Sequence, residues 1–105
     1  MPKHNLTKAT DISKKVRNIV LERDRYCVVC GSPYNLTLAH YISRSHMGKG
    51  IPKNLVTLCI NCHHAYDNGK SKERADEIKL IMKSHLVSHY RFWKEEDLKY
   101  KKGLI

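Results

Sequence analysis

CVVCGSPYNLTLAHYISRSHMGKGIPKNLVTLCINCHHAYD, residues 27–67, contains all four cysteines of the chain as two CxxC pairs. The pairs are Cys27 with Cys30 and Cys59 with Cys62, and 28 residues separate them. One CxxC pair is weak evidence of metal binding, because redox proteins use the same spacing. Two pairs in so short a chain predict one structural zinc ion held by four thiolates. The length of the intervening segment indicates that it holds further structure.

Two disulfides, or a redox role for one pair, are the competing interpretations of the cysteines. The N-terminus, MPKHNLTKATD, carries charge with no apolar segment behind it, so no signal peptide is predicted. No apolar stretch approaches the ~20 residues that span a bilayer. We therefore expect a cytoplasmic protein without membrane contact. A reducing cytoplasm favours bound metal over disulfides.

The charge balance is strongly basic, with 20 Lys and Arg against 10 Asp and Glu and a net charge of +10. Such an excess in a small protein favours a polyanionic partner such as DNA, although a merely solubilising surface would also give it. Within residues 26–70, Asp67 is the only acidic residue. A lone carboxylate in this segment is a candidate for a specific role.

Apolar periodicity predicts a helix before the first cysteine pair and two strands between the pairs. The helix covers residues 12–24 and has Asp11 as its N-cap. The strands cover residues 36–42 and 54–58. The loop between them, residues 43–53, is basic and contains two glycines. Its Arg44, Lys49 and Lys53 are candidate contacts to a phosphate backbone, and a mobile surface connection is the alternative interpretation of the loop.

Two helices are predicted after the second strand. Asn61 is expected to cap the first, on which His63 and Asp67 are i and i+4 and share a face. This spacing allows two side chains to bind one metal ion. A longer helix should begin at Ser71 and end near residue 90.

The chain is expected to form a single domain over residues 1–105. Residues 12–70 would be its motif-bearing core, and residues 71–105 its C-terminal helix and a peripheral tail. Residues 1–10 are interpreted as a flexible arm.

The order of these features resembles the HNH endonuclease family, and in particular the small zinc-stapled HNH proteins of bacteriophages. The resemblance rests on a CxxC pair, His40 on a strand, Asn54 opening the second strand, and a second CxxC followed at once by His63. It implies an α+β fold with a ββα-metal core, in which a helix packs across a two-stranded hairpin. An N-terminal helix and a longer C-terminal helix would flank this core and its four-cysteine zinc site.

The resemblance also implies a role for each motif residue. His40 corresponds to the general base. Asn54 corresponds to the asparagine that orders the hairpin loop and helps to hold the base. His63 corresponds to a ligand of the catalytic divalent ion, and Asp67 lies where some members place another ligand.

One position departs from the family pattern. The residue before the base is often an acidic or histidine ligand, but here it is Ala39. We therefore expect His63 and Asp67 to hold the ion with more water, while His46 or His64 remains an alternative ligand. A histidine on an apolar strand face, as His40 is, would otherwise be interpreted as a core residue.

The implied function is metal-dependent hydrolysis of phosphodiester bonds in DNA, by nicking or by double-strand cleavage. The implied cofactors are a structural Zn²⁺ and a catalytic Mg²⁺ or Mn²⁺, with Co²⁺, Ni²⁺ or Zn²⁺ as alternatives. A phage-encoded monomer or weak dimer, acting in the host cytoplasm beside packaging proteins, would fit the resemblance. The alternative is a non-catalytic zinc-stabilised DNA-binding module, which would not need His40, Asn54 and His63 together.

Overall fold

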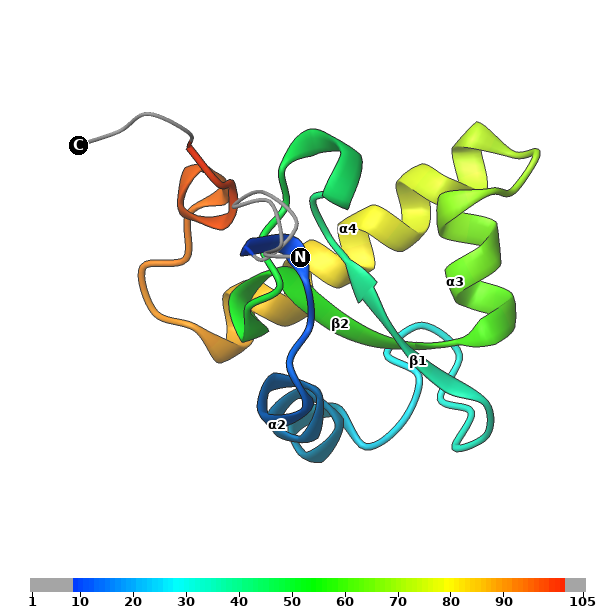
Figure 1. The fold of residues 1–105 in the computed structure, drawn as a ribbon. Coiled ribbons are helices and arrows are strands. Elements are labelled where there is room, and N and C mark those ends of the chain that lie inside the picture. Colours follow the sequence, from blue (N-terminus) through cyan, green and yellow to red (C-terminus); the bar gives the residue numbers. More distant parts are fainter. Residues whose placement is uncertain (1–8, 102–105) are drawn as a thin grey trace, which may run out of the picture.

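The structure, a computed structural model, describes residues 9–101. The fold is α+β, with one two-stranded sheet among the described residues (Figure 1). The helices and strands run in the order α2 (Lys14–Asp24), β1 (Leu36–His40), β2 (Leu55–Cys59), α3 (Ile60–Asp67) and α4 (Lys72–His89). Three short 3-10 turns complete the order: η1 (Arg44–His46), η2 (Pro52–Asn54) and η3 (Glu95–Leu98).

The two strands form an antiparallel hairpin whose faces are covered by different helices. Leu36 pairs with Cys59, and His40 pairs with Leu55. Because side chains alternate along a strand, each face packs against its own neighbours. On one face Leu38 packs with Val20 of α2. On the other face the buried strand residues join α3 and α4 in the main core: Ala39, Val56, Leu58, Cys62, Ile78, Met82 and Leu86.

Helix α2 begins later than predicted, and its N-cap is Ser13 rather than Asp11. The Ser13 hydroxyl accepts a hydrogen bond from the Val16 amide at 3.1 Å. The Asp11 carboxylate instead pairs with Arg44, which lies in the loop between the strands. Asp11 is a good N-cap residue by local sequence, but in the folded chain its carboxylate forms a tertiary ion pair instead.

Helix α3 follows β2 directly, and a cysteine caps it in place of Asn61. The sulfur of Cys59 accepts a hydrogen bond from the Cys62 amide at 3.5 Å. The CxxC spacing and the helix start are thus one feature. The ββα arrangement predicted for this segment is confirmed.

The segment that precedes α2 is part of the fold, so the flexible-arm prediction is wrong for residues 9 and 10. We call residues 9–12 the N-terminal strap. The Gly50 amide donates to the Ala9 carbonyl at 2.9 Å. A Cβ atom at Gly50 would lie 2.0 Å from the Asp11 carbonyl oxygen, so only glycine allows the strap to lie this close. Residues 1–8, the rest of the predicted arm, lie outside the described residues.

The C-terminal tail is also structural, and its prediction as peripheral is wrong. Leu98 is fully buried in the main core. Its carbonyl accepts a hydrogen bond from the Lys49 amide at 2.7 Å, and the Tyr100 amide donates to Met47 at 2.7 Å. The tail therefore holds the loop between the strands from outside.

Candidate active site and metal centre

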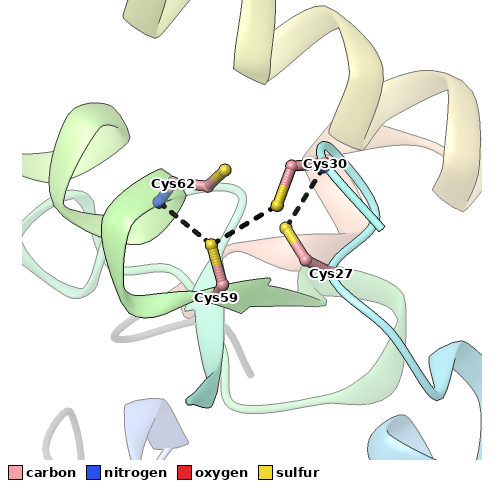
Figure 2. Close-up of side chains that lie close together, drawn as sticks. All are labelled: Cys27, Cys30, Cys59 and Cys62. Carbon is pink, nitrogen blue, oxygen red and sulfur yellow. Dashed lines mark hydrogen bonds between the residues drawn. The ribbon is translucent and has the colours of Figure 1, made fainter. Parts of the chain in front are cut away.

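The four cysteines come together at the junction of the first loop, β2 and α3. Cys27 and Cys30 lie on the turn after α2, Cys59 ends β2, and Cys62 is in the first turn of α3. Figure 2 shows the four sulfurs turned toward one another. All four sulfur atoms lie within 4.8 Å of each other, and those of Cys30 and Cys59 are 3.6 Å apart.

This cluster fits a tetrahedral zinc ion. A zinc–sulfur bond of about 2.3 Å places tetrahedral sulfurs roughly 3.8 Å apart, which matches the observed spacing. Four soft thiolates are the donor set that zinc prefers. The cluster joins elements that are far apart in sequence, so an ion there would fix the end of the hairpin against α3.

A cleft of about 920 Å³ lies beside the hairpin. The side chains that line it come from the N-terminal strap, β1, the 43–53 loop, α3, α4 and the tail. His40, His63 and Asp67 all line it, so the structure brings three of the predicted site residues to one place.

His40, the last residue of β1, is half-buried in the cleft wall. Its Nε2 atom lies 2.9 Å from the Thr10 carbonyl oxygen. A carbonyl can only accept, so Nε2 carries the proton and Nδ1 keeps its lone pair. Burial holds the pKa of His40 below its ordinary value of 6.5, against an opposing effect of the Thr10 carbonyl. The ring is therefore a neutral proton acceptor at physiological pH.

His63 and Asp67 form the pair that the i, i+4 spacing predicts. The Nε2 atom of His63 lies 2.8 Å from an Asp67 carboxylate oxygen. Two cis ligands at about 2.1 Å from an octahedral ion would be roughly 3.0 Å apart, so the pair fits one small divalent ion. The other ring nitrogen, Nδ1, lies 2.7 Å from the Thr37 hydroxyl.

The two alternative ligands differ in position. His46 lines the cleft, and its Nδ1 atom is 2.7 Å from the Ser43 hydroxyl. His64 is exposed and is not among the described residues that line the cleft. Geometry therefore leaves His46 as the only one of the two that faces the same space as His63.

Asn54 is fully buried and acts on the backbone of the loop rather than in the cleft. Its amide oxygen accepts from the Ile42 amide at 2.8 Å, and its nitrogen donates to the carbonyls of Ile42 and Lys49 at 3.0 and 2.9 Å. These bonds fit the loop-ordering role that the resemblance implies. The contact that orients His40 comes from the Thr10 carbonyl instead, and no sequence motif indicated Thr10.

The three predicted DNA contacts are not equally placed. Arg44 lines the cleft, although it also pairs with Asp11. Among the described residues the lining does not include Lys49 or Lys53. Lys79 of α4 and Lys99 of the tail line it and were missed, because both lie in segments that looked unrelated to the site.

Two tyrosines in the cleft wall act as fixed donors. The hydroxyl of Tyr41 donates to Glu95 at 2.6 Å, and that of Tyr66 donates to the Tyr41 carbonyl at 2.6 Å. Burial raises the pKa of Tyr66 to about 12, and burial together with Glu95 raises that of Tyr41 further. Both stay protonated at neutral pH, so neither competes with His40 as a base.

A second group of metal-binding side chain types, Asp24 with His85 and His89, is a structural junction. Their ligand atoms lie within 4.8 Å of one another. Both carboxylate oxygens of Asp24, however, accept hydrogen bonds from the Arg23 guanidinium. A guanidinium already in place opposes a further cation by charge and occupies the oxygens that it would need.

Comparison with known proteins identifies the segment that carries the cleft. Residues 27–69, from the first cysteine to two residues after α3, match the family model described as HNH endonuclease. The resemblance to HNH endonucleases that the sequence indicated is therefore confirmed for this segment. The HNH family consists of phosphodiester-hydrolysing enzymes, and its matched segment here contains the hairpin, α3 and all four cysteines.

The fold around the HNH segment is also found in a solved structure. The type IV phosphorothioation-dependent restriction endonuclease ScoMcrA matches with a TM-score of 0.61 and 22% sequence identity. The match covers 85% of this chain and 20% of the ScoMcrA chain. At this identity the likeness is one of fold. No curated protein gives a significant match.

In the part of the chain that the structure describes, every helix is too short or too polar to cross a membrane.

Proposed function

We propose that the chain is a metal-dependent DNA endonuclease that hydrolyses phosphodiester bonds in the cleft beside the hairpin. The observation that carries the proposal is that His40 and the His63–Asp67 pair line one cleft, in a segment of the HNH family. A scaffold without catalysis would need no such convergence of a neutral imidazole with a pair of metal-binding side chains.

His40 is the general base of this proposal. The Thr10 carbonyl keeps the proton on Nε2 and turns the ring, so the Nδ1 lone pair is free to accept a proton from water. The neutral form predominates at physiological pH because burial lowers the pKa of the ring. A positioned base of this kind contributes about 10²–10⁴-fold to the rate.

His63 and Asp67 would hold the catalytic divalent ion. When bound, such an ion neutralises a non-bridging phosphate oxygen and stabilises the departing 3′-oxygen. One imidazole and one carboxylate, with water in the remaining positions, suit Mg²⁺ or Mn²⁺. Co²⁺, Ni²⁺ and Zn²⁺ are alternatives, and His46 is the residue placed to replace the ligand missing at Ala39.

DNA is the proposed substrate because basic side chains border the cleft. Arg44, Lys79 and Lys99 line it, and the whole chain carries a net charge of +10. Phosphate contacts of this kind position the backbone without reading sequence. A lone chain would nick one strand at each encounter, and double-strand cleavage would need a second event or a second copy. A phage setting with packaging proteins stays a prediction of the resemblance.

The test is cleavage of supercoiled plasmid DNA with each divalent ion, comparing nicked with linear product. His40→Ala is expected to lower the single-turnover rate by about 10²–10⁴-fold while zinc content and thermal stability are kept. His89→Ala, which removes an exposed histidine of α4 outside the cleft, is the matched control and should cleave normally.

Normal cleavage by folded His40→Ala would remove His40 from the mechanism. If the wild-type chain binds DNA but cleaves it with none of these ions, the proposal fails, and the alternative is a zinc-stabilised DNA-binding module. In either case binding should weaken steeply with salt, because phosphate contacts release counterions.

A further inference from the structure

Thr37 of β1 has a hydroxyl group placed between two partners. Its oxygen lies 2.8 Å from the Leu58 carbonyl oxygen on the neighbouring strand and 2.7 Å from Nδ1 of His63 on α3. Thr37 and Leu58 are register partners in the hairpin, so the hydroxyl is set by the sheet rather than by a loop. Its geometry therefore transmits the position of the hairpin to the imidazole ring.

The direction of these two hydrogen bonds follows from proton count. A hydroxyl has one proton, and a carbonyl oxygen can only accept. Without that proton, two oxygens at 2.8 Å would face each other with lone pairs alone. The Thr37 proton therefore points to Leu58, and toward His63 the hydroxyl oxygen is an acceptor. It follows that Nδ1 of His63 carries a proton.

A proton on Nδ1 decides which ring nitrogen can bind a metal. In a neutral imidazole the other nitrogen, Nε2, then keeps the lone pair. Nε2 is also the atom that lies 2.8 Å from the Asp67 carboxylate. A carboxylate oxygen can only accept, so in the structure without an ion Nε2 carries a proton as well, and a divalent cation would take the place of that proton between Nε2 and Asp67.

We propose that Thr37 is a positioning residue that fixes the Nδ1–H tautomer of His63 and so presents Nε2, together with Asp67, to the divalent ion. This inference rests on the proposed function for the identity of the ion's site. It assigns a task to a residue that lies outside the motif and that its place in the sequence did not mark. Outer partners of metal-bound histidines typically affect metal affinity by about 10–100-fold.

The opposite arrangement at His40 supports the same logic. There a backbone carbonyl places the proton on Nε2 and leaves the lone pair on Nδ1. The two histidines of one cleft thus meet their orienting oxygen atoms through different ring nitrogens, His40 through Nε2 and His63 through Nδ1. This leaves Nδ1 of His40 to accept a proton and Nε2 of His63 to bind a metal ion.

The first measurement is the ring protonation of His63 in the zinc-loaded protein with saturating Mg²⁺, by long-range ¹H–¹⁵N correlation NMR. His63→Gln assigns the signals. The wild-type ring is expected to be protonated at Nδ1. A wild-type ring protonated at Nε2 would overturn the inference without any variant of Thr37.

The second measurement compares variants by Mn²⁺ titration. Thr37→Val keeps the shape but removes the acceptor, and should lose the Nδ1–H preference and about 10–100-fold in Mn²⁺ affinity. Thr37→Ser keeps the hydroxyl and should retain both. Wild-type tautomer and affinity in folded Thr37→Val would refute the inference. If Thr37→Val does not fold, the wild-type and Thr37→Ser spectra still decide.

These readouts separate the inference from the nuclease proposal. Mn²⁺ affinity and tautomer that depend on the Thr37 hydroxyl, in a protein that cleaves no DNA, would support the inference and defeat the proposed activity. DNA cleavage by a wild-type protein whose His63 ring is protonated at Nε2 would support the nuclease proposal and refute the inference about Thr37.

Discussion

At the scale of single residues, the cleft depends on oxygen atoms that orient its histidines. The Thr10 carbonyl and the Thr37 hydroxyl each contact one ring nitrogen, at 2.9 and 2.7 Å. Neither threonine belongs to the sequence pattern that predicted the site. The pattern predicts which side chains act in the site, whereas neighbours from elsewhere in the chain decide which ring nitrogen of each histidine faces the cleft.

The pH profile of cleavage should report the environment of His40. Burial lowers its pKa below 6.5, Arg44 and His63 act in the same direction, and the Thr10 carbonyl and Asp67 oppose them. Because the base works in its neutral form, cleavage should fall only when the pH drops through this lowered value. We expect the acid limb of kcat/KM to lie below pH 6.5, with a plateau from there to pH 8. A limb above pH 6.5 would contradict this assignment.

At the scale of elements, the N-terminal strap should control the base through Gly50. A Cβ at this position would meet the Asp11 carbonyl oxygen at 2.0 Å, so Gly50→Ala must displace the strap. The Thr10 carbonyl would then leave Nε2 of His40. Misplacing a catalytic group by about 1 Å can cost 10²-fold, and we expect cleavage by Gly50→Ala to fall by up to about that factor.

Two measurements on Gly50→Ala serve as its structural control: the zinc content and the amide NMR signals of the hairpin. Both should be retained, because the four cysteines of the cluster come from the turn after α2, from β2 and from α3. Unchanged cleavage with a displaced strap would show that the Thr10 carbonyl does not position the base.

The junction at Asp24 joins α2 to the hairpin and α4. Its carboxylate, which is fully buried, accepts from Arg23, from the Thr57 amide at 2.9 Å and from His85 at 2.6 Å. Burial by itself would raise the pKa of Asp24, but the hydrogen bonds from His85, Arg23 and Thr57 lower it well below its ordinary value. The stabilisation is therefore complete above the unfolded pKa of about 3.9 and is lost as the pH falls toward the folded pKa.

Asp24→Asn should thus lower the free energy of unfolding by about 3–5 kcal/mol at pH 7, the usual cost of breaking a buried ion pair. Urea denaturation at pH 7 and pH 3 measures the effect, and the gap from wild type should narrow at pH 3. The exposed Lys72–Asp76 pair is the control, because Asp76→Asn should cost less than about 1 kcal/mol. An equal loss of unfolding free energy in Asp24→Asn and Asp76→Asn would show that the junction stabilises the fold no more than an exposed ion pair does.

At the scale of the whole molecule, two ion sites with different donors should respond differently to chelators. Four thiolates favour a tightly held zinc, whereas an imidazole and a half-exposed carboxylate hold an ion weakly. We expect mild EDTA to abolish cleavage while the circular dichroism spectrum is unchanged. Harsher chelation should release about one zinc per chain and unfold the protein. Simultaneous loss of activity and structure under mild EDTA would argue against separate ions.

Much of the architecture could be read from local patterns. The strands, the buried stripe of α4 and the i, i+4 pair on α3 all follow from periodicity, which depends on neighbouring residues alone. The caps could not be read in the same way. Asp11 and Asn61 are both good N-cap residues by local sequence. In the fold, however, Asp11 pairs with Arg44, and the sulfur of Cys59 caps α3.

The sequence alone determined which groups could do chemistry: two CxxC pairs, two motif histidines and one isolated carboxylate, at spacings that only a small number of folds can use. Tertiary structure alone decided which nitrogen of each histidine meets an orienting oxygen, and that the strap, α4 and the tail complete the cleft. The physical reason is range. Periodicity and ligand spacing act over a few residues, whereas a hydrogen bond such as that from His40 to Thr10 joins positions whose proximity exists only after the chain has folded.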